Sequence, residues 1–188
     1  MPPRRKYKKL PTIPPWKEVE SILRATGRER DRLVLMLAAF LGLRVSEITK
    51  LEVPNLDFGR SVLWVRDSKG GADRAIPIPK FLRGPLRGWI GSRQSGPLFP
   101  SRKGGGHLTT RALQHLIKRI AGIAKLPESG RPRKYHMHVL RHAAACRWLE
   151  GGATIYEVKE LLGHSSVAVT ERYLHTVPER LAEVVDRL

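Results

Sequence analysis

Hydrophobic residues recur with a helical period over most of this chain. Between residues 16 and 51 the pattern predicts an amphipathic helix, a longer helix over the apolar run "LVLMLAAFLGL" (33–43) and, after a break at Gly42, a short helix over "VSEITKL". The apolar run is about half as long as a membrane-spanning helix, which needs roughly 20 residues. It therefore predicts a buried core helix, and we expect no membrane span.

Two short stretches instead follow the pattern of β-strands. "SVLWV" (61–65) and "RAIPIP" (74–79) flank the segment "RDSKGGAD". Its Gly70-Gly71 pair can adopt turn conformations that are closed to bulkier residues. We therefore expect an antiparallel β-hairpin that carries Lys69 near its tip.

The pattern becomes helical again after the second strand. Thr154 and Glu157 have the spacing of a capping box, which marks the start of one helix. Thr176 and Glu179 repeat this spacing before an apolar stripe, so we expect a short amphipathic helix over 176–188. The predicted fold class is mainly α with a small antiparallel β-hairpin or sheet (α+β). The helices between the hairpin and the last segment are expected at about 80–91, 109–124, 138–150 and 155–162.

The chain is strongly basic. It has 35 Lys and Arg residues against 17 Asp and Glu, which gives a formal net charge of +18 and a sequence pI of about 10.9. Nucleic acid is the favoured partner, because neutralising its phosphates releases condensed counterions, and an acidic membrane surface is the alternative. Residues 1–15 are expected to form a basic flexible arm or linker. Its expected contacts with the DNA backbone are Arg4, Arg5, Lys6, Lys8 and Lys9.

The start of the chain and its cysteine content favour an intracellular protein. "MPPRRKYKKL" is basic but is followed by no apolar segment, so we expect no secretory signal. The chain has a single cysteine, Cys146, so it can form no internal disulfide, which suits a reducing compartment. We expect Cys146 to be a buried packing residue. We expect a cytoplasmic, nucleoid-associated protein.

Residues that can perform chemistry lie in "LGLRVSEITKL", at the hairpin tip, in "HVLRH" and in "LLGHSSVAVTERYLH". In this order they match a G-x-R-x-S-E pattern, a hairpin lysine, an H-x-x-R pattern, an L-G-H pattern and a tyrosine nine residues later. The chain thereby resembles the tyrosine recombinase family, also called phage-integrase-like, from about residue 16 to residue 188. The residues that carry the resemblance are Arg44, Lys69, His138, Arg141, His164 and Tyr173.

The residue types agree with this resemblance on chemical grounds. A phosphodiester is negatively charged and repels an anionic nucleophile. Two guanidinium groups on its non-bridging oxygens can neutralise that charge without a metal. Arg44 and Arg141 are the expected clamp, and Glu47, one helical turn after Arg44, is expected to orient the Arg44 guanidinium.

The remaining roles are those that the resemblance implies. It implies a tyrosine recombinase catalytic-domain fold over 16–175, in which Tyr173 attacks a DNA phosphate and forms a 3′-phosphotyrosyl link. His138 and His164 would bind phosphate oxygens, and His138 would take the phenolic proton. Lys69 would protonate the departing 5′-oxygen. The link conserves bond energy, so we expect no metal, no ATP and no other cofactor.

The resemblance also implies partners. Double-stranded DNA is the expected substrate, and copies of the chain would form a homo-oligomer on it, a tetramer when two sites pair. The helix 176–188 would dock on a neighbouring subunit in a ring-closing exchange, and the alternative is that it covers its own domain. Most relatives carry a further helical domain before the catalytic fold, whereas here only residues 1–15 precede it. The sequence leaves open whether such a domain was removed.

Three other functions are alternatives. A type IB topoisomerase uses a similar set of residues but relaxes supercoils within one duplex. A DNA-binding module could keep the fold without strand transfer, although binding alone needs no tyrosine at this position. A metal-dependent nuclease needs clustered carboxylates, whereas the five aspartates are scattered. The spacing of His136, His138 and His142 suggests zinc, but no cysteine pair accompanies them and we expect no metal site.

Overall fold

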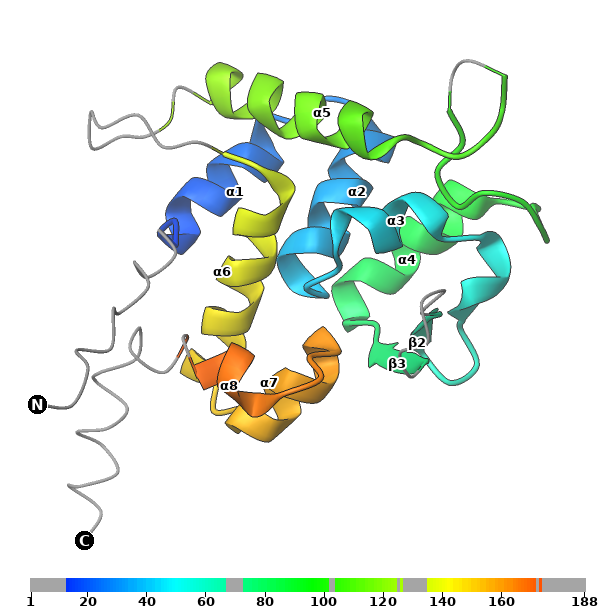
Figure 1. Ribbon diagram of the computed structural model, residues 1–188. Helices are drawn as coiled ribbons and strands as arrows, with labels where there is room; N and C mark the ends of the chain where they lie inside the picture. Colours follow the sequence, from blue (N-terminus) through cyan, green and yellow to red (C-terminus); the bar gives the residue numbers. More distant parts are fainter. Residues whose placement is uncertain are drawn as a thin grey trace, which may run out of the picture.

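The computed structural model contains eight α-helices, one 3₁₀ helix and three strands within the residues that it describes (Figure 1). Those residues are 13–66, 73–101, 104–124, 126, 135–171 and 173. The bounds are α1 Trp16–Arg24, α2 Glu29–Phe40, α3 Val45–Lys50, η1 Val53–Asn55, β1 Leu56–Asp57, β2 Val62–Val65, β3 Arg74–Pro77, α4 Lys80–Ile90, α5 Thr110–Ile123, α6 Met137–Glu150, α7 Ile155–Leu162 and α8 Val167–Thr170.

Side-chain caps mark the starts of helices α5 and α7, and the cap at Thr154 is the one that the sequence predicts. Thr109 precedes α5, and its Oγ1 accepts a hydrogen bond from the backbone N–H of Ala112 at 3.1 Å. Thr154 precedes α7 in a full capping box: its Oγ1 accepts from the Glu157 N–H at 3.2 Å, while its own N–H donates to Glu157 Oε2 at 2.6 Å. These bonds satisfy N–H groups that have no partner inside the helix.

The three strands form one antiparallel sheet in the order β1-β2-β3. Val62 pairs with Pro77 and Val65 with Arg74, and the residues of β2 alternate between half-buried and buried. The predicted hairpin is confirmed. Strand β1 was not predicted, because a strand of two residues is too short to show an alternating pattern. The predicted tip with Lys69 lies outside the described residues.

Helices α2 and α6 pack against each other in the core, and α7 and α8 lie at one end of α6 (Figure 1). Helix α6 is buried on nearly all sides, which explains why "MHVLRHAAACRWLE" shows no amphipathic stripe. Strand β3 contacts α7. The turn after α2, the strand β3 and the end of α7 therefore meet, although they are far apart in the sequence.

Gly42 makes the close approach at that meeting point possible. Its φ is +62°, and a Cβ there would lie 2.9 Å from side-chain atoms of both Trp148 and Leu162. A bulkier residue would be strained in its backbone and would clash with two core side chains. The break that the sequence predicts at Gly42 is thus the point where the α2–α3 turn packs on α6 and α7.

Two predicted segments lie outside the described residues: the basic arm with Arg4, Arg5, Lys6, Lys8 and Lys9, and the helix 176–188. Their structures and the predicted domain boundaries stay predictions. Cys146 is buried in the core, as expected. Across the described ranges, no helix has both the length and the apolar character needed to cross a membrane.

Candidate active site

Arg44 and Glu47 form the first part of the site, at the start of α3. Arg44 is the residue before the helix, in an extended conformation, and its backbone N–H donates to Glu47 Oε2 at 2.7 Å. Its Nη1 donates to Glu47 Oε1 at 2.8 Å, and its Nη2 to the Gly163 carbonyl at 3.0 Å. Glu47 therefore binds the Arg44 guanidinium, a contact that the helical spacing predicts. The Arg44 side chain is still 35% exposed and open to a ligand.

Arg141 lies in α6 and is only 1% exposed. Its Nη1 donates to the Gly42 carbonyl and its Nη2 to the Leu162 carbonyl, each at 2.6 Å. Its Nη1 also lies 3.8 Å from Glu47 Oε2. The buried Nε has no hydrogen-bond partner among the described residues. A buried N–H donor without an acceptor lowers the stability of the folded state, and an acceptor that reached this group would stabilise the site.

Opposing effects act on the charge of Arg141. Burial lowers its pKa to about 10, and the positive charges of Arg44 and Arg74 act in the same direction. The carboxylate of Glu47 and the phenol of Tyr173 act the other way. Because a pKa of about 10 lies well above neutral pH, Arg141 remains a cation in the core.

Glu47 also interacts with a third arginine that sequence reasoning missed. Arg74 of β3 donates from Nη1 to Glu47 Oε1 and from Nη2 to Glu47 Oε2, each at 3.0 Å. Burial acts to raise the pKa of Glu47, but the hydrogen bond and charge of Arg74, the Arg44 N–H and the charge of Arg141 outweigh it and lower that pKa. One signal was available: Arg74 lies two residues before the apolar Ile76 in a predicted strand, so the two side chains share a face, and Ile76 is buried in the core.

Tyr173 follows α8 and is 2% exposed. Its hydroxyl lies 2.6 Å from Nδ1 of His142, which is also buried. His138 lies one helical turn earlier, is exposed, and has its ring centre 4.5 Å from that of His142 in an edge-on arrangement. The phenol is thus bonded to His142, whereas the resemblance implies His138 as its base. Sequence reasoning weighed His142 only as a zinc ligand, although it directly follows Arg141 on the same helix.

His164 stands at the turn between α7 and α8. Gly163 ends α7 in the left-handed conformation, with φ of +63°. The Nδ1 of His164 then lies 2.8 Å from Oγ1 of the buried Thr170. This bond ties the turn to the last turn of α8, just before Tyr173. The interval of nine positions from His164 to Tyr173 therefore contains one turn and one short helix, after which Tyr173 lies against α6.

The charges of this cluster suit an anion. The three guanidinium groups of Arg44, Arg74 and Arg141 surround the single carboxylate of Glu47, so three positive charges and one negative charge leave +2. Positive charge held at a partly buried site attracts phosphate strongly. Among the described residues, no group of three or more His, Cys, Asp and Glu side chains could hold a metal ion. Lys69 lies outside those residues.

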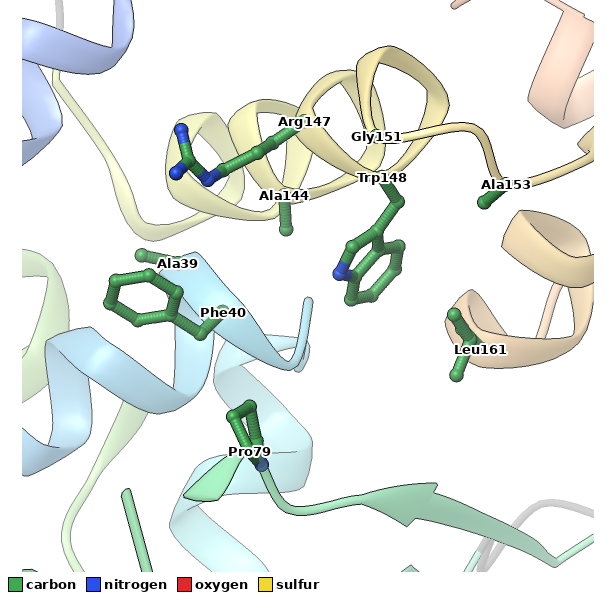
Figure 2. A pocket seen from close by; sticks show the side chains of 9 residues that line it. All are labelled: Ala39, Phe40, Pro79, Ala144, Arg147, Trp148, Gly151, Ala153 and Leu161. Atoms are coloured by element: carbon green, nitrogen blue, oxygen red, sulfur yellow. The ribbon is translucent and has the colours of Figure 1, made fainter. Parts of the chain in front are cut away.

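A pocket with different chemistry lies on the α2 and α6 side of α7 (Figure 2). It has a volume of about 360 Å³, and Figure 2 shows Trp148 and Leu161 extending into it from α6 and α7. Its single ionised side chain is Arg147, whose guanidinium stacks on the Trp16 ring at 4.2 Å. The pocket has no acid or base for catalysis and suits an apolar occupant with some negative charge. Its lining is Ala39, Phe40, Pro79, Ala144, Arg147, Trp148, Gly151, Ala153 and Leu161.

Known proteins share this sequence pattern and fold. The sequence profile of the Phage integrase family matches residues 15–180. Tyrosine recombinase XerA of Thermococcus kodakarensis is 35% identical over 167 residues, which are 85% of this chain and 56% of that protein. The crystal structure of XerA recombinase matches with a TM-score of 0.81 at 25% identity, over 100% of this chain and 66% of that one.

A DNA complex is among the similar structures. XerH site-specific recombinase, bound to its palindromic difH substrate in a post-cleavage complex, matches with a TM-score of 0.78 at 27% identity. The match covers 94% of this chain and 53% of the XerH chain. The chain spans less than two thirds of the length of four XerA relatives that it matches, at 56%, 64%, 63% and 62%.

Proposed function

Because this chain belongs to the Phage integrase family, we propose that it is the catalytic domain of a site-specific DNA recombinase, which cleaves and rejoins DNA through a 3′-phosphotyrosyl intermediate. One observation carries the proposal. Consecutive residues of α6 serve the two halves of the site: Arg141 belongs to the arginine cluster around Glu47, and His142 bonds the hydroxyl of Tyr173. One helix thus carries an anion-binding group and, on the next residue, the histidine that bonds the nucleophile.

In the proposed first step, Arg44 and Arg141 bind the non-bridging oxygens of the scissile phosphate. The Nε–H of Arg141, which has no partner among the described residues, supports this role, because a phosphate oxygen could accept from it. Charge that develops on these oxygens in the transition state is stabilised by guanidinium groups already in position. Arg44, with its partly exposed side chain, is the outer half of the clamp.

In the second step the phenolic oxygen of Tyr173 attacks phosphorus and the P–O5′ bond breaks. The phenolic proton passes to a histidine; the 2.6 Å contact supports His142 as its first acceptor, with His138 next to it on the same helix. Lys69, from the hairpin, gives a proton to the departing 5′-oxygen. Rejoining reverses these transfers: a 5′-hydroxyl attacks the phosphotyrosyl link and Tyr173 leaves.

Oligomerisation on DNA is a separate proposal. The segment 176–188 is expected to present an apolar stripe with acidic residues beside it, and the pocket of Figure 2 is apolar with one cation, Arg147. This complementarity supports docking of that segment from a neighbouring subunit, which would link the subunits of a complex on paired DNA sites. The similarity to recombinases, rather than topoisomerases, favours exchange between two duplexes.

The chemistry is tested by trapping the covalent adduct. The substrate is a library of nicked duplexes with a randomised central site. After cleavage, the short fragment between the cleaved bond and the nick, which bears the new 5′-hydroxyl, diffuses away. Rejoining is then prevented, so protein–DNA adducts accumulate and their sequences can be read. We expect the wild-type chain and Tyr156→Phe, a change at an exposed tyrosine of α7, to form the adduct. Tyr173→Phe should form none, and EDTA should have no effect. An adduct formed by Tyr173→Phe, or cleavage that needs a metal, would refute the proposal.

A further inference from the structure

Arg74 uses its whole guanidinium group to join three elements. Two of its nitrogens bind the two oxygens of Glu47 in α3, each at 3.0 Å. Its Nε donates to the Leu161 carbonyl at the end of α7, also at 3.0 Å. The side chain itself starts from β3 and is 12% exposed. A planar group held by three hydrogen bonds has little freedom to move.

The hydrogen bonds from Arg74 to Glu47 determine how close that carboxylate lies to the other two arginines. Arg44 already binds Oε1 at 2.8 Å, whereas Arg141 stays 3.8 Å from Oε2. With both oxygens occupied by Arg74, the carboxylate is not free to turn toward Arg141. Without Arg74, Glu47 could move closer to Arg141 and turn the present 3.8 Å ion pair into a direct hydrogen-bonded one. That pair would compete with phosphate for the same guanidinium group.

Arg74 also sets the position of the turn that carries His164. A Cβ at Gly163 would lie 2.8 Å from Nη1, 3.1 Å from Cζ and 3.2 Å from Cδ of Arg74, so the glycine packs directly on the side chain. The bond from Nε to the Leu161 carbonyl connects Arg74 to the same turn. One side chain therefore fixes both the carboxylate of the arginine cluster and the start of the α7–α8 connection.

We propose that Arg74 is a positioning residue of the reaction: it keeps Glu47 from closing on Arg141 and keeps the α7–α8 turn in register, so that the partly exposed Arg44 guanidinium and the Nε–H of Arg141 stay available to the scissile phosphate. This inference rests on the proposed function. It assigns no contact with DNA to Arg74. The residue acts through Glu47 and Gly163, and its loss should affect the chemical step more than the binding of DNA.

The test uses a nicked duplex selected from the library above, with protein in excess, and measures the rate of adduct formation in a single turnover. Arg74→Gln should lower that rate on the order of 10²-fold, the cost of small misplacements of catalytic groups. The dissociation constant for the duplex should change little. Arg74→Lys keeps the positive charge but lacks the planar guanidinium group, so its rate should lie between those of wild type and Arg74→Gln. Arg83→Gln is the matched control: Arg83 binds the Ile78 carbonyl after β3 at 2.9 Å and has no bond to Glu47.

A second substrate separates positioning from general damage. On a duplex whose scissile phosphate is a neutral methylphosphonate, the arginine clamp has less charge to stabilise, so the rates of Arg74→Gln and wild type should converge. The part of the defect that comes from the α7–α8 turn would remain, but a rate deficit as large as that on the ordinary duplex would show that Glu47 is not involved and would overturn the inference. If Arg74→Gln does not fold, as seen by thermal unfolding, Arg74→Lys takes its place in both assays. A folded Arg74 variant that forms the adduct on the ordinary duplex at the wild-type rate also overturns the inference.

The two proposals fail in different ways. If the wild-type chain forms no adduct that depends on Tyr173, the proposed function fails and the role of Arg74 falls with it. If the wild-type chain reacts and Arg74→Gln reacts equally fast, only the inference on Arg74 fails.

Discussion

The hydroxyl of Tyr173 lies 2.6 Å from Nδ1 of His142, across 31 positions of the sequence. Both side chains are buried. When a neutral imidazole carries its ring proton on Nε2, its Nδ1 can accept a hydrogen bond from a phenol. The bond therefore gives the proposed nucleophile a base within direct reach, and it holds the segment after α8 against α6.

This contact predicts unequal effects for the two histidines of α6. His142→Gln should slow adduct formation on the order of 10²-fold, since a positioned general base contributes at least that much. His138→Gln, the matched change one helical turn away, should slow adduct formation less. The measurement is the single-turnover rate on the selected nicked duplex. The opposite order would return the role of base to His138, as the family resemblance implies.

Loss of the carboxylate of Glu47 should destabilise the fold. Glu47→Gln would leave three guanidinium groups without their shared counter-charge, two of them largely buried. We expect a loss of about 3 kcal/mol in the free energy of unfolding near neutral pH, typical of breaking a buried pair by removing one partner. Urea denaturation checks this value, with Glu150→Gln at the exposed end of α6 as a control. Equal stability of both variants would contradict the prediction.

The same residue predicts a pH dependence. The pKa of Glu47 is lowered from 4.5 because Arg74, Arg44 and Arg141 together outweigh the effect of burial. Its ionised form therefore favours the folded state. That stabilisation is complete above pH 4.5 and is lost as the pH falls through the lower pKa of the folded protein. The difference in unfolding free energy between wild type and Glu47→Gln should shrink over this range and stay constant above it.

A side chain at Gly163 should lower both the stability and the activity of the protein. Gly163→Ala combines a left-handed backbone with a Cβ 2.8 Å from Arg74 Nη1, so we expect a loss of about 1–2 kcal/mol and slower adduct formation. Gly122→Ala is the control, because Gly122 lies in α5 and a Cβ there meets nothing within 4 Å. That change should stabilise the protein slightly, since alanine favours helix. Thermal unfolding of both variants decides the matter, and a neutral Gly163→Ala would count against the packing described.

The proposed role of Lys69 can be tested by the leaving group. Lys69→Ala should cleave an ordinary duplex poorly but recover on a duplex with sulfur in place of the 5′-bridging oxygen, because a thiolate leaves without a proton. Tyr173→Phe should not recover on the same substrate. A Lys69→Ala variant that stays inactive there would assign the acid role to another residue.

Docking of the C-terminal segment should depend on the pocket of Figure 2. Removal of residues 176–188 should leave cleavage of a single duplex intact and abolish complexes that join two duplexes. Filling the pocket with Ala153→Phe should have the same effect, because the side chain lines it. Analytical ultracentrifugation of protein with DNA measures the complexes. A pocket-filled variant that still joins two duplexes would place the docking surface elsewhere.

Much of the fold follows from local sequence patterns. The cap at Thr154, the break at Gly42 and the alternation of 61–65 each depend on a few neighbouring residues, and the structure confirms them. The pairing of Arg44 with Glu47 was also predictable, because three positions along a helix bring side chains together. Strand β1 was missed because two residues carry no periodic signal.

The sequence by itself determined the chemical types in the site and their order, since each motif lies within one element or turn. Only the tertiary structure decided their partners. Arg74 reaches Glu47 across 27 positions and His142 reaches Tyr173 across 31. These bonds depend on how β3 packs beside α3 and how the segment after α8 returns to α6. Buried charges and hydroxyls must find partners when water is excluded, and the packing of distant segments determines which partners are within reach.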